Sequence, residues 1–254
     1  MYKLNQLTKL LGFTLAETLI VMGVIGIVSA LTLPNLNSST GDKERVAKVK
    51  KIYQNLNDAL GRAVAVYGPY GAWFVNDGNS VGDDAANSKR GGERITEFMK
   101  LSKDCKQVAN SGCFTTGNIK QFNGTANGGN IDSSSYSYKV ITADGTSISF
   151  DVNPVNKQLY ITIDIDGPSK GAYTYGKDVF LFQTDASFNV MPEGYNRTFA
   201  EVIDEFVTRG KGAYSSAWII NYDNADYLQI QSVSGSTATC KNGNTMTESH
   251  PRCK

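Results

Sequence analysis

The first strong pattern in the chain is an apolar run over residues 13–33, which reads "FTLAETLIVMGVIGIVSALTL". About 20 apolar residues in a helix cross the hydrocarbon core of a bilayer, so this run predicts a membrane-spanning helix. Its one charged side chain is Glu17. A carboxylate in lipid costs free energy unless it is paired. We therefore expect Glu17 to have a functional partner.

The next pattern is an apolar stripe over residues 46–67, with steps of three and four positions. Its members are Val46, Val49, Tyr53, Leu56, Leu60, Ala63 and Tyr67. This spacing predicts an amphipathic helix. Thr40 or Asp42 can cap it, and Gly68 and Pro69 end it. A coiled coil has a similar stripe, but fewer than four repeats followed by strands favour packing on a sheet. Together the two helical segments would extend roughly 80 Å.

Alternating apolar and polar positions then predict four strands. "YSYKVITADGTSISFDV" reads as two strands around Asp144 and Gly145, a pair typical of a type I′ hairpin turn. "QLYITIDI" and "DVFLFQT" supply the third and fourth. Strands in this order predict an antiparallel meander, with one face free to cover the helical stripe.

Two further helices are predicted in the remaining sequence. "GERITEFMKLS" places Ile95, Phe98, Met99 and Leu101 at rough helical spacing, inside a loop-rich region over residues 68–135. "YNRTFAEVIDEFVTRGKG" is amphipathic, and the side chains expected to face inward are Phe199, Val202, Ile203 and Phe206. The segment after it, "AWIINYDNADYLQIQSV", is aromatic and resembles a strand.

Composition narrows the class of protein. The 254 residues carry a net charge of +1. Without Lys3 and Lys9, which lie before the apolar run, the net charge is −1. Neither value is the strongly positive charge that is typical of a nucleic-acid-binding protein. The even number of cysteines indicates disulfides in an exported protein, with three possible connectivities. The short spacings favour Cys105 with Cys113 and Cys240 with Cys253. A metal site is the alternative, but the chain has no C-x-x-C.

The residues before the apolar run carry a close resemblance. "MYKLNQLTKLLG" is short, basic and free of acids, which is typical of a cytoplasmic leader. With the following "FTLAE" it resembles the processing signal of type IV pilins and type II secretion pseudopilins. The resemblance implies cleavage between Gly12 and Phe13, N-methylation of Phe13, and an assembly role for Phe13 and Glu17. Pro34 resembles the family proline that loosens the helix.

The resemblance also implies a fold class. We expect an α+β, type IV pilin-like fold. A long N-terminal helix, with a membrane half and an amphipathic half, would pack on an antiparallel sheet of about four strands. The expected segments are a leader (1–12), a transmembrane or filament-core helix (13–36), an amphipathic helix (37–67), a head (68–185) and a C-terminal extension with a Cys-bounded loop (186–254). The long helix on a sheet, and the "DIDGPSKGAYTYGKDVFLF" turn, resemble this family as well.

The function implied is that of a structural filament subunit in adhesion, motility, DNA uptake or secretion. The implied partners are identical or related pilin subunits, prepilin peptidase, the assembly platform with its ATPase, and the membrane, with no specific nucleic acid. The protein would reside in the bacterial inner membrane and then in a cell-surface or periplasmic filament. The alternatives are a type II secretion pseudopilin, or a membrane-anchored extracytoplasmic binding module. The first 35 residues or so carry most of the resemblance.

Two other features of the sequence point to different interpretations. An ordinary secretory signal ending at "VSA" would leave Glu17 inside its apolar core. The basic flank "DKERVAKVKK" favours a cytoplasmic position by the positive-inside rule, in conflict with the disulfides.

Candidate chemistry is sparse in the sequence. We found no catalytic constellation and expect neither an enzyme nor a confident cofactor. Asp164, Asp166 and Asp178 are weak calcium candidates, because their spacing does not match an EF-hand. Tyr67, Tyr70, Trp73 and Phe74 are expected to pack in the core, and His250 to lie on the surface.

Overall fold

The computed structural model describes residues 14–74, 81–126, 129–153, 158–185 and 187–253, with residues 29–39 and 81–83 described by their backbone alone. The chain divides into two compact units, Met1–Asp42 and Lys43–Lys254. Helix α1 contributes to both of them.

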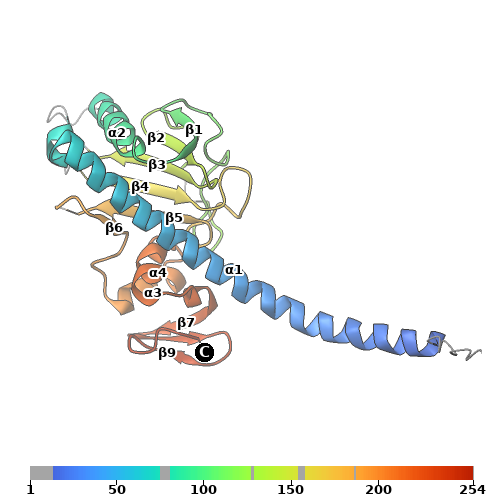
Figure 1. Ribbon diagram of the computed structural model, residues 1–254. Helices are drawn as coiled ribbons and strands as arrows, with labels where there is room; N and C mark the ends of the chain where they lie inside the picture. Colours follow the sequence, from blue (N-terminus) through green and yellow to red (C-terminus); the bar gives the residue numbers. More distant parts are fainter. Residues whose placement is uncertain (1–13, 75–80, 127–128, 154–157, 186, 254) are drawn as a thin grey trace, which may run out of the picture. The chain divides into compact units, whose positions relative to one another are not determined.

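The described elements follow one another in the order labelled in Figure 1. The helices are α1 (Leu15–Tyr67), η1 (Tyr70–Trp73), α2 (Val81–Thr96), α3 (Phe199–Val207), α4 (Ser215–Tyr222) and η2 (Asp226–Gln229). The strands are β1 (Leu101–Lys106), β2 (Tyr138–Thr142), β3 (Ser147–Val152), β4 (Leu159–Asp164), β5 (Val179–Thr184), β6 (Val190–Pro192), β7 (Ile230–Ser234), β8 (Thr237–Cys240) and β9 (Thr245–Met246).

The second unit is built around a six-stranded antiparallel sheet in the order β1-β2-β3-β4-β5-β6. Each strand pairs with the next one in the sequence, so short turns suffice as connections. Phe150 of β3 lies opposite Ile161 of β4, and Ile161 lies opposite Phe182 of β5. These three side chains are buried. They form a row across one face of the sheet.

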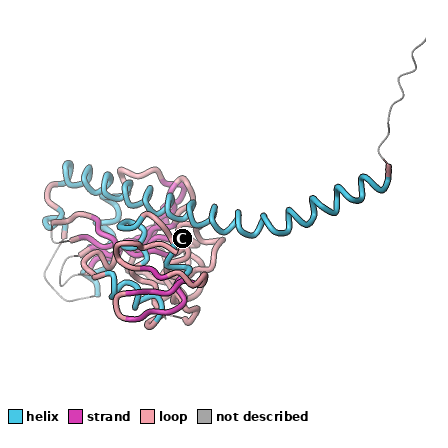
Figure 2. The backbone as a smooth tube through the Cα atoms, turned by 90° about the horizontal axis from the view of Figure 1, so that it is seen from below, coloured by secondary structure: helices cyan, strands magenta, loops and turns pink. Residues whose placement is uncertain are grey.

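Residues 43–67 of α1 cover that face of the sheet, as both views show (Figures 1 and 2). Among the residues of the sequence stripe, Val46, Val49, Leu56, Leu60 and Ala63 are buried, and Tyr53 packs against the same core. The predicted stripe is therefore correct at these positions. Burying such side chains contributes roughly 1.5–3 kcal/mol each for the larger ones.

The opposite face of the sheet has a smaller core of its own. Its buried members are Cys105, Cys113, Phe114, Ile119, Tyr173 and Val179. Most of them come from the connection between β1 and β2 or from the turn before β5. The described parts of this connection, residues 107–126 and 129–137, thus cover this face.

The C-terminal part forms a second layer beside β5 and β6. Its three-stranded sheet has the order β7-β8-β9, and α3 and α4 lie between it and the large sheet (Figure 1). The side chains of Phe199, Val202, Ile203 and Phe206 on α3 are buried, as the sequence predicted. Trp218 of α4 and Tyr227 of η2 complete an aromatic cluster with them.

The predicted fold class is wrong. The large sheet has six strands where about four were expected, and a second sheet of three strands follows it. No helix in the described part of the chain is long and apolar enough to cross a membrane. The extra strands escaped prediction because β1 reads "LSKDCK" without apolar alternation and β6 has only three residues. Such strands are fixed by their neighbours and carry little periodicity of their own.

Three local predictions also need correction. The hairpin between β2 and β3 forms, but only Gly145 has a positive φ, so its turn cannot be type I′. Helix α2 begins at Val81 and ends at Thr96, well before the predicted Leu101, which lies in β1. The segment "AWIINY" was predicted as a strand but forms most of α4. Its apolar and aromatic side chains pack into the main core as part of a helix.

Candidate assembly surface

The start of α1 exposes an unusual amount of apolar surface. Nine large apolar side chains between 15 and 28 are each more than half exposed: Leu15, Leu19, Ile20, Val21, Met22, Val24, Ile25, Ile27 and Val28. Contiguous apolar surface of this kind marks an interaction site in a native protein. Because these positions surround the helix, the surface can contact neighbours on several sides.

Glu17 has a local partner at the start of this surface. Its carboxylate accepts hydrogen bonds from the backbone N–H and the hydroxyl of Thr14, each at 2.8 Å. The Thr14 hydroxyl in turn accepts a bond from the backbone N–H of Glu17 at 3.2 Å. This reciprocal arrangement is a capping box, in which both side chains satisfy N–H groups that a helix start leaves free. The pattern T-x-x-E in the sequence signals this capping box, so Thr14 is a site residue that could have been predicted from sequence alone.

The other residues of the predicted processing and assembly site are Gly12, Phe13 and Pro34. Gly12 and Phe13, to which cleavage, N-methylation and the amine partner of Glu17 were assigned, lie outside the described residues. Pro34 falls within the bounds of α1, but its side chain also lies outside the described part. Its role as a helix break stays a prediction.

The basic flank of the second unit is held by the head. Lys48 pairs with Asp166 at 3.2 Å, Lys50 with Asp223 at 2.8 Å, and Lys51 with Asp144 at 2.7 Å. The three aspartates come from three separate turns, after β4, after α4 and between β2 and β3. The flank therefore has intramolecular carboxylate partners.

These ion pairs bear on the conflict over membrane orientation. The positive-inside rule counts basic residues in short loops near the ends of a span. Lysines that are paired with folded head residues cannot remain behind if the head is exported. The pairs thus link the position of these lysines to that of the head, although each exposed pair adds only about 0–1 kcal/mol to folding stability.

The three calcium candidates do not form a shared ligand set. The Asp178 carboxylate accepts bonds from the backbone N–H groups of Tyr173 and Thr174, each at 2.6 Å, while Asp166 is paired with Lys48. Burial, followed by the nearby Asp178 charge, raises the pKa of Asp164 to about 7. Within the described ranges, no group of three or more His, Cys, Asp or Glu side chains is placed to hold a metal ion.

In the aromatic cluster after α1, Tyr70 and Trp73 lie in the core and Phe74 packs against it, whereas Tyr67, also expected in the core, is exposed. Tyr70 and Trp73 are almost fully buried, and the Trp73 indole N–H donates to the Gly68 carbonyl at 2.9 Å. The Arg94 guanidinium lies 4.7 Å from the centre of the Tyr67 ring and closes the cluster from outside. His250 is exposed, as expected for a surface residue.

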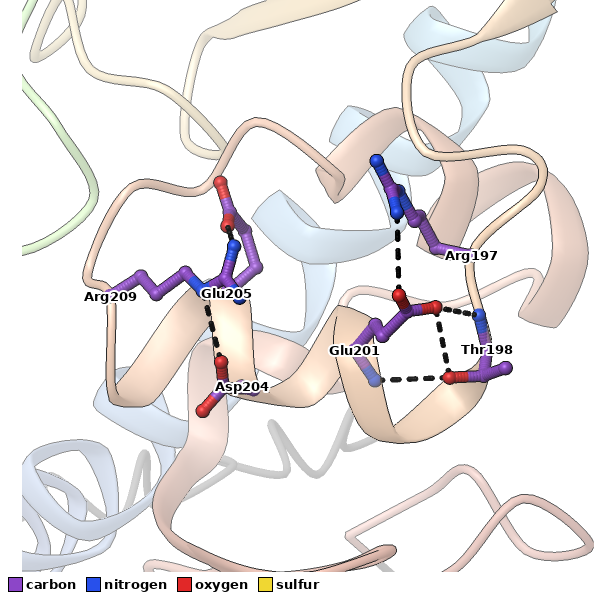
Figure 3. A network of polar contacts seen from close by, with 6 residues as sticks. All are labelled: Arg197, Thr198, Glu201, Asp204, Glu205 and Arg209. Carbon is purple, nitrogen blue, oxygen red and sulfur yellow. Dashed lines mark hydrogen bonds and ion pairs between the residues drawn. The ribbon is translucent and has the colours of Figure 1, made fainter.

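A polar network holds α3 in place (Figure 3). Thr198 and Glu201 form a second capping box, with the same reciprocal bonds as Thr14 and Glu17. Arg197 pairs with Glu201 at 3.3 Å, and Arg209 pairs with Asp204 at 3.1 Å. These contacts provide hydrogen-bond and charge partners at the two ends of a short helix, so the role of the network is structural. It offers no arrangement of a nucleophile and a base.

Comparisons with known proteins add no family. No family model, no curated protein and no solved structure matches this chain significantly.

Proposed function

We propose that this protein is a structural subunit of a type IV pilus-like filament. The observation that carries the proposal is the exposed apolar start of α1, capped by Thr14 and Glu17 and directly preceded by the "GF" pair of the processing signal. An exposed apolar helix needs a partner, and copies of the same helix are suitable ones. A bundle of such helices would form the filament core.

The proposed route begins at the inner membrane. Prepilin peptidase cleaves between Gly12 and Phe13 and methylates the new amine of Phe13. Platform and ATPase components then transfer the subunit into a cell-surface or periplasmic filament. There Glu17 pairs with the Phe13 ammonium of a neighbouring subunit, because close pairing reduces the cost of both charges in an apolar bundle. The partners are identical or related subunits.

Two features of the second unit support export of the head. Cys105 is paired with Cys113 and Cys240 with Cys253, which suits an oxidising compartment. The lysines that follow the apolar helix are paired with head aspartates. The proposal requires no cofactor.

Purification of sheared surface filaments, followed by intact-mass measurement, tests the proposal. The expected chain begins at methylated Phe13 and is enriched in the sheared fraction. Gly12→Leu is the matched control, and it should leave the leader attached and the filament fraction empty. A chain beginning at Leu31 would indicate an ordinary secretory signal, and the proposed function would then be wrong.

The same fractions separate the alternatives. A type II secretion pseudopilin would have the same processed N-terminus, but it would remain in a periplasmic filament and its deletion would block secretion. A membrane-anchored binding module would stay monomeric in the membrane fraction. Cross-linking of intact cells distinguishes the two, because only a filament subunit gives a ladder of homo-oligomers or of related subunits.

A further inference from the structure

Lys139 is a lysine in the interior of the large sheet. It is the second residue of β2, and its exposed fraction is 0%. Its neighbours Tyr138 and Val140 belong to the core under α1, so the Lys139 side chain faces the opposite side of the sheet. A buried charge is costly unless hydrogen bonds replace its hydration. The surroundings of Lys139 supply these bonds.

The Lys139 ammonium is surrounded by backbone carbonyls. It donates to the carbonyl oxygen of Asp132 at 2.9 Å, to that of Ile131 at 3.4 Å, and to that of Ser134. An ammonium has three donors, and three carbonyls receive them here. Carbonyl oxygens are also the groups with which proteins bind hard metal cations. Burial lowers the pKa of Lys139, and the nearby Asp132 carboxylate opposes that shift.

Asp132 connects this turn to the first disulfide. Its carboxylate, almost fully buried, accepts bonds from the backbone N–H groups of Gly112 and Cys113 at 3.1 Å each and of Phe114 at 3.3 Å. One residue thus offers its carbonyl to the ammonium and its carboxylate to the chain around Cys113. A displacement of the turn would release both sets of bonds together.

The segment held in this way needs support. Residues 107–137 contain no strand within their described part, and unstructured connections of such length are uncommon in compact domains. The segment nevertheless covers one face of the sheet and keeps Cys105 at 5% and Cys113 at 0% exposure. Local periodicity cannot order it, so its order depends on a few specific contacts.

We propose that the Lys139 ammonium acts as a built-in structural cation, which holds the described parts of the β1–β2 connection, residues 107–126 and 129–137, closed over the Cys105–Cys113 disulfide and shields that disulfide from reduction. A tethered ammonium gives the segment a cation that no chelator can remove. The Cys240–Cys253 disulfide lies in a different part of the fold and does not depend on it.

Reduction kinetics of the full chain test this proposal. Lys139→Met removes the charge at nearly constant volume. The two disulfides are followed separately, by alkylation and peptide mapping after timed exposure to dithiothreitol. Loss of a charge-assisted hydrogen-bond set should speed reduction of Cys105–Cys113 roughly tenfold or more. The rate at Cys240–Cys253 should stay unchanged. An unchanged Cys105–Cys113 rate would overturn the proposal.

Lys103→Met is the matched control. Lys103 also donates to a carbonyl of this segment, that of Ser111, but its side chain is exposed. We expect a much smaller effect from this variant. Equal acceleration by the two variants would show that the buried ammonium has no special role.

A second measurement keeps the proposal open to refutation if Lys139→Met unfolds. Asp132→Asn leaves the carbonyl ligand in place and weakens the link to residues 112–114. Asp132→Asn alone should therefore speed reduction of Cys105–Cys113 and leave Cys240–Cys253 unchanged. Where Lys139→Met folds, the double variant should reduce Cys105–Cys113 no faster than the faster of the two single variants, because both act on one network. Independent, multiplicative effects would overturn the proposed linkage. Faster reduction of both disulfides in Asp132→Asn would overturn it as well.

Discussion

At the first turn of α1, the Glu17 carboxylate accepts a hydrogen bond from the backbone N–H of Thr14, and the Thr14 hydroxyl accepts one from the backbone N–H of Glu17. This relationship gives Glu17 a role within its own chain, in addition to the proposed pairing with Phe13 of a neighbour. The two roles differ in what they require. Capping needs an acceptor at position 17, whereas pairing needs a negative charge there.

Substitutions at Glu17 separate these roles. Glu17→Gln keeps an acceptor that can cap the helix, and Glu17→Ala removes both functions. If the charge drives assembly, both variants will be cleaved normally and will be largely absent from sheared filaments. Thr14→Ser keeps the cap and serves as the control at wild-type yield. Wild-type yield of Glu17→Gln filaments would show that capping is enough and that no charge pair is needed.

Two glycines in helices should respond in opposite ways to alanine. Gly61 lies in α1 with no atom within 4 Å of an added Cβ, so Gly61→Ala should stabilise the fold by roughly 0.4–1 kcal/mol. At Gly92 of α2 the added Cβ would lie 2.4 Å from the Tyr138 ring. Gly92→Ala should therefore destabilise the fold by about 1–3 kcal/mol. Urea denaturation of both variants checks this pair, and equal signs would contradict the packing described for α2.

Asp164 should make the stability of the head depend on pH. Its folded pKa is raised from 3.8 to about 7, so the native state holds a proton that the unfolded chain releases between these values. The stabilisation is present below pH 4 and is lost as pH rises toward 7. The loss is at most about 4 kcal/mol. Asp164→Asn should flatten this part of the pH profile and raise the melting temperature at pH 8. If the stability of the wild-type protein and of Asp164→Asn changed with pH in the same way, the raised pKa of Asp164, and its burial beside the Asp178 charge, would be contradicted.

The Cys240–Cys253 disulfide should contribute measurably to stability. It closes a loop with a sequence separation of 13 residues, for which chain entropy gives about 3 kcal/mol. Replacing both cysteines by serine should lower the free energy of unfolding by about that amount. Differential scanning calorimetry, with the wild-type chain under non-reducing conditions as reference, measures the change. Non-reducing peptide maps that join either cysteine to Cys105 or Cys113 would contradict the pairing itself.

Local patterns determined much of the second unit. The stripe from Val46 to Ala63, the hairpin around Gly145 and the inward face of α3 follow from spacing alone, because one element buries one face. The start of α1 also has a local signature. The sequence T-x-x-E specifies the Thr14–Glu17 capping box without help from any other part of the chain.

Contacts between distant residues were decided only by the tertiary structure. The charged strand β1 is recognisable only from its pairing with β2, and α4 only from the core that its aromatic side chains fill. Lys48 and Asp166 are more than one hundred positions apart, and neither residue marks its partner in the sequence. The same holds for Lys139, which reads as a polar position of a strand. Its burial depends on which loop covers the far face of the sheet, and residue periodicity along one element carries no information about its neighbours in space.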